Sequence, residues 1–144
     1  MKKFLKHILK IMILFCFGGL TYVLIELIFR GFSHWTMMIL GGLSFVLVGL
    51  FNEIKPDTPI EIQMIEGGLL ITILEFLTGL LVNIKLNMNI WDYSDIKFNL
   101  MGQICLPFSL LWICISGLII YIDDLLRWKL FKEPVPKHLH IFED

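Results

Sequence analysis

Four long apolar stretches constrain this chain more than any other feature of its sequence. A transmembrane α-helix needs about 20 predominantly apolar residues, and stretches of that kind cover about residues 11–29, 35–51, 59–84 and 104–122. The composition agrees, since 57% of the residues are hydrophobic and only 17% are charged, whereas soluble domains carry about 25% charged residues. We therefore predict an all-α polytopic membrane protein with four transmembrane helices, arranged as two helical hairpins in a membrane domain of residues 11–122.

The distribution of lysine and arginine predicts how these helices are oriented. Loops on the cytoplasmic side of a membrane carry an excess of these residues. One side of the predicted bundle carries most of these residues and the other side carries few. The first side holds Lys2, Lys3, Lys6, Lys10, Lys55, Arg127, Lys129, Lys132 and Lys137, and the second holds Arg30, Lys85 and Lys97. We expect residues 1–10 to be a cytoplasmic basic N-terminus and residues 123–144 a cytoplasmic juxtamembrane helix and tail, in the cytoplasmic membrane. The partner of such a surface is the lipid bilayer, and we expect no nucleic-acid partner.

The start of the third stretch resembles a helix N-terminus. Thr58 is followed by Pro59 at the expected first helical position and by Glu61 three residues after the threonine. This arrangement is typical of a capping box, in which the threonine and glutamate side chains bond the first free backbone amides.

A short internal repeat links the first and third stretches. The motif Gly18-Gly19-Leu20, followed by Glu26, recurs 49 residues later as Gly67-Gly68-Leu69, followed by Glu75. Small residues let membrane helices approach closely. We therefore expect the two small and polar stripes to face each other, in the bundle or across a dimer interface. The stripes comprise Gly19, Tyr22, Glu26, Arg30 and Ser33 in one, and Gly68, Thr72, Glu75, Gly79 and Asn83 in the other.

Ionisable side chains inside the apolar stretches are the first candidates for function. A charged group at the membrane centre costs about 2.5–3.5 kcal/mol on insertion scales, so it is expected to face a partner or a cavity. Glu26 precedes Arg30 by one helical turn, whereas Glu75 has no cation near it in the sequence. We expect a Glu26–Arg30–Glu75 cluster, which is either a structural latch or an ion, proton or substrate site.

The segment between the third and fourth stretches is unusually polar for a loop beside a membrane span. Aromatic-belt and helix-capping roles explain part of it. A half-buried segment that lines a cavity would use the remaining polar groups. The candidate binding residues of this segment are Asp92, Tyr93, Asn99 and Gln103.

The same segment and the start of the fourth stretch carry a set of specific motifs. They are Trp91-Asp92-Tyr93-Ser94, Asn99-Leu100, Gly102-Gln103-Ile104-Cys105-Leu106 and Trp112. With these motifs the chain resembles, over roughly residues 15–125, the CmpB-type ABC-transporter (type IV) membrane protein family of small bacterial multi-span proteins. The resemblance implies a permease subunit. The sequence has no GxxxxGK[ST] phosphate-binding motif, so any ATPase would be a separate subunit.

Three functions remain open at this stage. The first is a transporter or permease subunit with an outward-facing polar site, working as a homodimer or larger assembly because four helices leave little room for a private pathway. The second is a non-transporting scaffold or accessory subunit with a Glu–Arg latch, and the third is a proton-coupled small exporter. An enzyme is the least supported reading, because no nucleophile–base pair is visible. We expect no cofactor and no metal site, because Cys16, Cys105 and Cys114 lack metal-ligand spacing and His138 and His140 alone are a weak signal.

Overall fold

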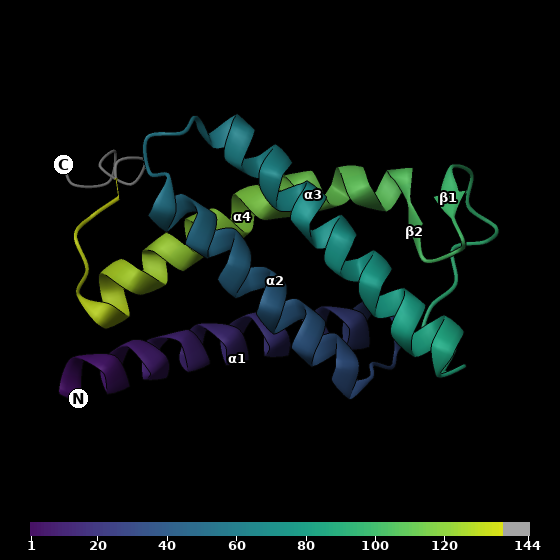
Figure 1. Ribbon diagram of the computed structural model, residues 1–144, viewed down its shortest axis with the longest axis horizontal. Helices are drawn as coiled ribbons and strands as arrows, with labels where there is room; N and C mark the ends of the chain where they lie inside the picture. The colour runs from purple at the N-terminus through teal and green to yellow at the C-terminus, as the bar shows by residue number, and fades with distance from the viewer. Residues whose placement is uncertain (137–144) are drawn as a thin grey trace.

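The computed structural model describes residues 1–136 and consists of four long α-helices, of which the third and fourth are joined by a longer connection that holds β1 and β2 (Figure 1). Lys137, His138 and His140, on which parts of the sequence interpretation depend, lie outside the described residues. Met1, the α2–α3 connection and the end of α4 lie at one end of the bundle, which we call the terminal end. Residues 86–105 lie at the opposite end, which we call the loop end. The elements are α1 (Lys2–Arg30), α2 (Trp35–Ile54), α3 (Ile60–Gly79), the π-helix η1 (Leu80–Lys85), β1 (Asn99–Leu100), β2 (Ile104–Cys105) and α4 (Leu106–Phe131).

The surface of the bundle confirms a membrane protein. Four helices, with η1 extending α3, are long and apolar enough to cross a membrane. Leu20, Leu24 and Ile28, spaced one turn apart on α1, are between 57% and 70% exposed, which would be unfavourable in water and suits lipid. The most buried side chains include charged ones, with Asp123 fully enclosed at 0% exposure. An apolar exterior around a polar interior is the arrangement that a bilayer selects.

Glycines set the helix pairing and correct one expectation. The most extensive contacts are between α1 and α2 and between α3 and α4, which confirms two helical hairpins. Gly19 of α1 lies against the backbone oxygen of Met38 of α2, and Gly68 of α3 lies against the backbone of Ile113 of α4. The expectation that the two glycine stripes face each other within the bundle is therefore wrong. Each stripe is used inside its own hairpin, because close backbone approach is needed where consecutive helices pack.

The boundaries of α3 and α4 differ from the sequence interpretation at two points. Helix α3 begins at Ile60 with Pro59 at the N-cap and no side-chain cap, so the expected capping box of Thr58 is wrong. The backbone oxygen of Thr58 instead accepts a hydrogen bond from Gln63 Nε2 at 2.8 Å. Helix α4 continues without interruption to Phe131. Arg127, expected at the membrane surface, is only 6% exposed and points into the bundle, because Asp123 on the preceding turn binds it.

The α3–α4 contact gives a first stability prediction. A methyl group added at Gly68 would lie 2.8 Å from the Cα and N atoms of Ile113, which cannot move aside, whereas one at Gly117 would meet only the flexible end of Met64 at 3.0 Å. Both substitutions give the same gain in helix propensity. We expect Gly68→Ala to lower the free energy of unfolding by about 1–3 kcal/mol relative to Gly117→Ala, measured by denaturant titration in mixed micelles. Equal stabilities of the two variants would contradict the close approach.

Candidate functional site

The loop end is built around Asn83 and Gln103, two buried amides that hold the polar loop against the helices. Asn83 Nδ2 donates to Gln103 Oε1 at 2.9 Å, and Asn83 Oδ1 accepts from the backbone amide of Ile90 at 2.7 Å. Asn87 and Asn89 have positive φ values of 51° and 47°, a conformation that asparagine tolerates better than most residues. These contacts turn the chain back from η1 toward the centre of the bundle.

The Trp91–Ser94 signature anchors this loop, each of its first three residues in a different way. Trp91 is 6% exposed and its Nε1 donates to the backbone oxygen of Gln103 at 2.9 Å. Exposed Asp92 accepts hydrogen bonds from the hydroxyl and the amide of Ser94, which lower the pKa of the Asp92 carboxyl. Tyr93 points inward, where burial raises the pKa of its hydroxyl and the nearby Glu75 carboxylate raises it further. The hydroxyl therefore stays protonated and can donate.

Asn99 has a local role in the same loop. Its Nδ2 donates to the backbone oxygen of Ile96 at 2.8 Å, and its Oδ1 accepts from the amide of Gly102 at 3.0 Å. Gly102 has a φ of +68°, and a side chain there would collide with Asp92 and Ser94. Asn99 and Asp92 thus shape the turn around β1 and β2 and are themselves exposed.

Glu75 is the polar centre of the bundle. It lies on α3 and is 3% exposed. Its Oε1 accepts from the Tyr93 hydroxyl at 2.9 Å, and its Oε2 accepts from Trp112 Nε1 of α4 at 3.0 Å. Phe108 stacks on the Tyr93 ring with a centroid distance of 4.9 Å. The carboxylate is therefore held by neutral donors within an aromatic wall.

Glu26 and Arg30 form a second hydrogen-bonded group, in which both carboxylate oxygens of Glu26 accept hydrogen bonds. Arg30 NH1 donates to Glu26 Oε1 at 2.9 Å, Ser33 Oγ donates to Glu26 Oε2 at 2.9 Å, and Arg30 NH2 donates to the backbone oxygen of Ile90 at 2.8 Å. The Glu26–Arg30 pair is thus confirmed, but the expected inclusion of Glu75 is wrong. Glu75 finds its donors on the loop and α4 because its helix makes its most extensive contacts with α4.

A cavity of about 190 Å³ lies beside Glu75 in the middle of the bundle, lined by residues of all four helices. Its lining is almost entirely apolar, with Ile71 and Ile119 among the wall residues. Ser44 of α2 also lines the cavity. It is 6% exposed and its hydroxyl has no hydrogen-bond partner among the described residues. Lining residues Ile25 of α1 and Leu118 of α4 are 47% and 62% exposed, so the cavity reaches the lipid-facing surface between these helices.

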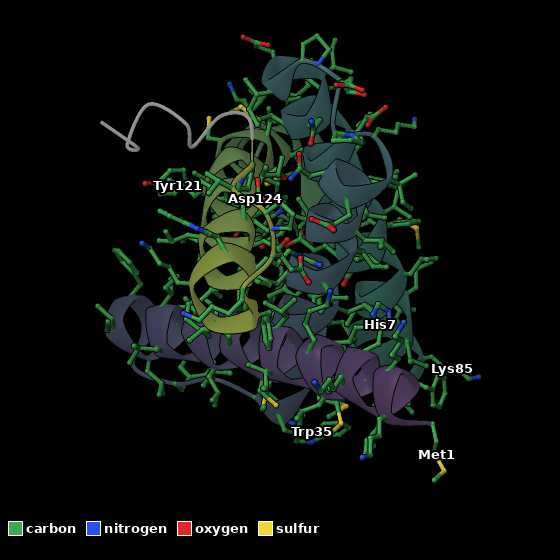
Figure 2. All side chains as sticks on the ribbon, turned by 90° about the vertical axis from the view of Figure 1, so that its left-hand side faces the viewer. Met1, His7, Trp35, Lys85, Tyr121 and Asp124 are labelled. Carbon is green, nitrogen blue, oxygen red and sulfur yellow. The ribbon has the colours of Figure 1, made fainter. Side chains whose placement is uncertain are left out.

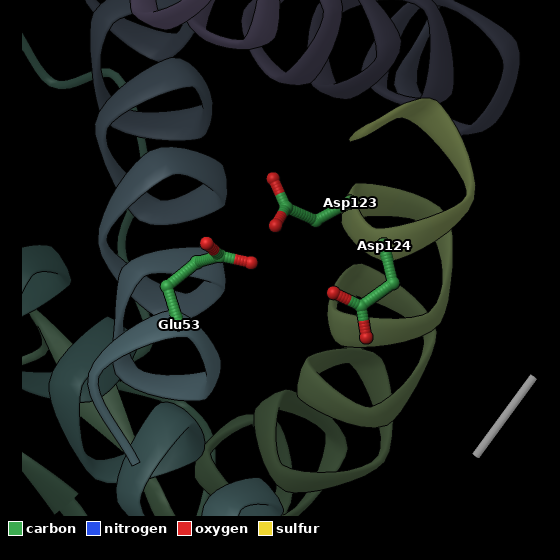
Figure 3. Close-up of side chains that lie close together, drawn as sticks. All are labelled: Glu53, Asp123 and Asp124. Atoms are coloured by element: carbon green, nitrogen blue, oxygen red, sulfur yellow. The ribbon is translucent and has the colours of Figure 1, made fainter. Parts of the chain in front are cut away.

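A second polar group lies at the terminal end. Figure 2 looks onto this end and shows Asp124 inside the bundle, whereas Tyr121 on the preceding turn of α4 points outward. Asp124, the adjacent Asp123 and Glu53 of α2 bring carboxylate oxygens within 4.8 Å of one another (Figure 3). Sequence spacing could not reveal this set, because Glu53 on α2 is separated from Asp123 and Asp124 by all of α3, the loop and most of α4. The sequence signal that was missed is the Asp123–Arg127 pair, spaced one turn apart near the end of an apolar helix.

The structure thus distributes the seven predicted site residues over four places. Glu75 and Tyr93 meet at the centre of the bundle, Glu26 pairs with Arg30, Gln103 pairs with Asn83, and Asp92 and Asn99 shape the loop. Of these seven, Glu75 is the one that lines the cavity. Ser44 and Trp112, which sequence reasoning did not select, line it as well.

Four membrane-compatible helices around a buried carboxylate and a cavity define a multi-pass membrane protein. Residues 11–142 match the family described as "Putative ABC-transporter type IV", and the chain belongs to this family. The match confirms the resemblance carried by the Trp91–Trp112 motifs. No solved structure matches the chain.

Proposed function

We propose that this chain is the membrane-spanning subunit of a transporter, and that its substrate binds in the cavity beside Glu75. The observation that carries the proposal is the combination of a cavity of about 190 Å³ with two buried polar groups that face it, the Glu75 carboxylate and the unpartnered Ser44 hydroxyl. Buried hydroxyls are normally hydrogen-bonded. An unpaired one beside a cavity suits a ligand that supplies the missing partner.

The lining indicates the class of substrate. Cavities of about 150 Å³ hold a benzene molecule in a dry apolar core, so this cavity suits an apolar group slightly larger than one aromatic ring. Each oxygen of Glu75 accepts one hydrogen bond from the protein and keeps a lone pair for another donor. We infer an amphipathic substrate with an apolar body and an ammonium or other hydrogen-bond donor, which enters from the bilayer between α1 and α4.

The topology and partners follow from charge and family. The lysine and arginine bias supports a cytoplasmic terminal end in the cytoplasmic membrane, which places Glu75 and the loop end toward the outside. Because the sequence has no phosphate-binding motif for ATP, energy from ATP would come from a separate ATPase subunit, as the family description suggests. A homodimer or larger assembly fits the proposal because four helices leave little room for a private pathway, and it would leave the cavity edge between Ile25 and Leu118 facing the lipid.

The two alternatives fit parts of the molecule less completely. A scaffold explains the Glu26–Arg30 pair, because its hydrogen bonds join α1 to Ser33 and to the backbone of Ile90. A scaffold does not explain a cavity lined by a hydroxyl that has no partner among the described residues. A proton-coupled exporter with an essential glutamate in the first span would need Glu26 to face a cavity. Both oxygens of Glu26 instead accept hydrogen bonds from Arg30 and Ser33, and Glu26 is not among the residues that line the cavity beside Glu75.

The proposal is tested by filling the cavity at Ser44. Purified protein in nanodiscs is titrated with 1-naphthylmethylamine, a probe with an apolar ring system and an ammonium group, by isothermal titration calorimetry. Ser44→Leu occupies the cavity and removes the unpaired hydroxyl, so we expect an unchanged or higher Tm together with at least about tenfold weaker probe binding, a loss of about 1.4 kcal/mol.

The matched control is Leu43→Phe, which enlarges the neighbouring residue on the lipid-facing side of α2, where Leu43 is 37% exposed. This variant should bind the probe as the native chain does. Native-like binding by Ser44→Leu, or equal loss in both variants, would refute binding in this cavity.

A further inference from the structure

The carboxylate group at the terminal end is enclosed between the last turns of α2 and α4. Asp123 and Asp124 are 0% and 1% exposed, while Glu53 reaches in from the rim of the bundle. Figure 3 shows the three side chains directed into one space between the two helices. One oxygen from each lies within 4.8 Å of the others, a separation at which carboxylates repel strongly unless a positive charge lies between them.

Among the described residues, Arg127 brings positive charge to this group and is shared among several carboxylates. Arg127 Nε binds Asp123 Oδ2 at 2.6 Å, but Arg127 NH1 is 3.5 Å from Glu53 Oε2 and 3.8 Å from Glu133 Oε2. Asn52 donates its Nδ2 to both oxygens of Asp124 at 2.8 Å, which adds a neutral donor and no charge. Arg127 thus binds Asp123 closely and reaches Glu53 and Glu133 only at longer distances, so a further cation beside the buried Asp123 carboxylate would offset more of the cost of its burial.

An independent feature identifies where a ligand would bind. Asp123 Oδ1 is buried and has no hydrogen-bond partner among the described residues, although Oδ2 of the same group is bound by Arg127. Gly49 of α2 makes room for this carboxylate, since any side chain there would overlap its carboxyl carbon and both oxygens. A buried carboxylate oxygen without a donor is costly, and here it lies in a space that two other carboxylates share.

We propose that Glu53, Asp123 and Asp124 bind one divalent cation of the oxygen-preferring class, Ca²⁺ or Mg²⁺. Carboxylate oxygens are the ligands that these hard cations favour. Oxygens on opposite sides of Ca²⁺ are about 4.6–5.2 Å apart and those around Mg²⁺ about 4.0–4.2 Å apart, twice the respective bond lengths. Three oxygens within 4.8 Å of one another can therefore share one such ion, and the separate titrations show which ion binds more tightly. The bound ion ties the ends of these two helices together at the terminal end.

The site is tested with the full chain, purified in detergent, stripped with EDTA and returned to chelator-free buffer. CaCl₂ and MgCl₂ are titrated separately by calorimetry, and Tm is followed in parallel against NaCl at matched ionic strength. We expect saturable divalent binding and a Tm that rises with divalent concentration, because a ligand of the folded state alone stabilises it. Glu53→Gln should weaken the affinity at least about tenfold, since even indirect partners of metal ligands contribute that much.

Glu53 is the variant of choice because its side chain is 38% exposed and its substitution should leave the fold intact. Asp123→Asn provides a second test at the buried position. The control is Glu61→Gln, which removes the same charge from an exposed residue at the same end of the bundle and should bind the ion normally. Absence of divalent binding to the native chain, a Tm rise that NaCl reproduces, or equal affinity of the Glu53 and Glu61 variants would overturn the proposal.

Discussion

Replacing Arg127 by glutamine is expected to lower the free energy of unfolding by about 3–5 kcal/mol, the usual cost of removing one partner from a buried ion pair. The guanidinium is 2.6 Å from Asp123 Oδ2, and both residues lie inside the bundle. Without it, Asp123 would retain a buried charge with neither oxygen paired. The measurement is unfolding by sodium dodecyl sulfate in mixed micelles, in buffer with EDTA so that no divalent ion replaces the lost charge.

Two further variants separate this effect from a general loss of charge. Lys129→Gln removes the same charge two residues later on α4, where the side chain is exposed, and should change stability by less than about 0.5 kcal/mol. The double variant Arg127→Gln with Asp123→Asn removes the unpaired charge and should recover part of the lost stability. An Arg127 variant as stable as the Lys129 variant would show that the pair contributes nothing to the fold.

Replacing Glu75 by glutamine should weaken the binding of amines while leaving the fold intact. Glutamine can offer its oxygen to Trp112 Nε1 and its amide to the Tyr93 hydroxyl, which can accept as well as donate. A hydrogen bond to a charged group contributes about 1.5–3 kcal/mol, so binding of 1-naphthylmethylamine should weaken by about 10- to 100-fold. The uncharged analogue 1-naphthylmethanol should bind the variant and the native chain nearly equally.

Glu75→Leu distinguishes this role from a purely structural one. Leucine leaves the Tyr93 hydroxyl and Trp112 Nε1 without their acceptor, at a cost of about 1–3 kcal/mol for each buried donor, so Tm should fall in this variant and hold in Glu75→Gln. If Glu75→Gln binds the amine as the native chain does, Glu75 is a structural acceptor and no part of the substrate site.

The membrane architecture was accessible from local sequence because its determinants are local. Span length and apolarity are sums over neighbouring residues, and they predicted four helices in two hairpins. The helices themselves extend beyond the predicted spans, since α1 begins at Lys2 and α4 ends at Phe131. The Glu26–Arg30 pair was equally accessible, because residues four apart lie on one helix face. The family resemblance rested on the Trp91–Ser94 segment, whose side chains hold the loop to Gln103 and Glu75.

The partners of the buried groups were not accessible in this way. Glu75 was expected beside Arg30 and instead binds Tyr93 and Trp112, because which helix faces which depends on where glycines allow close approach. The prediction of a capping box at Thr58 was wrong for a related reason. The Thr58 backbone oxygen accepts a hydrogen bond from the buried side chain of Gln63, and α3 has no side-chain cap.

The sequence by itself therefore determined that this protein lies in a membrane, that it has four apolar helices in two hairpins, and which family it belongs to. Only the tertiary structure decided that Glu75 and Ser44 face one cavity and that Glu53 meets Asp123 and Asp124. The physical reason is that transfer into lipid is nearly additive along the chain, whereas burial of a charge depends on the rotation and packing of helices distant in sequence.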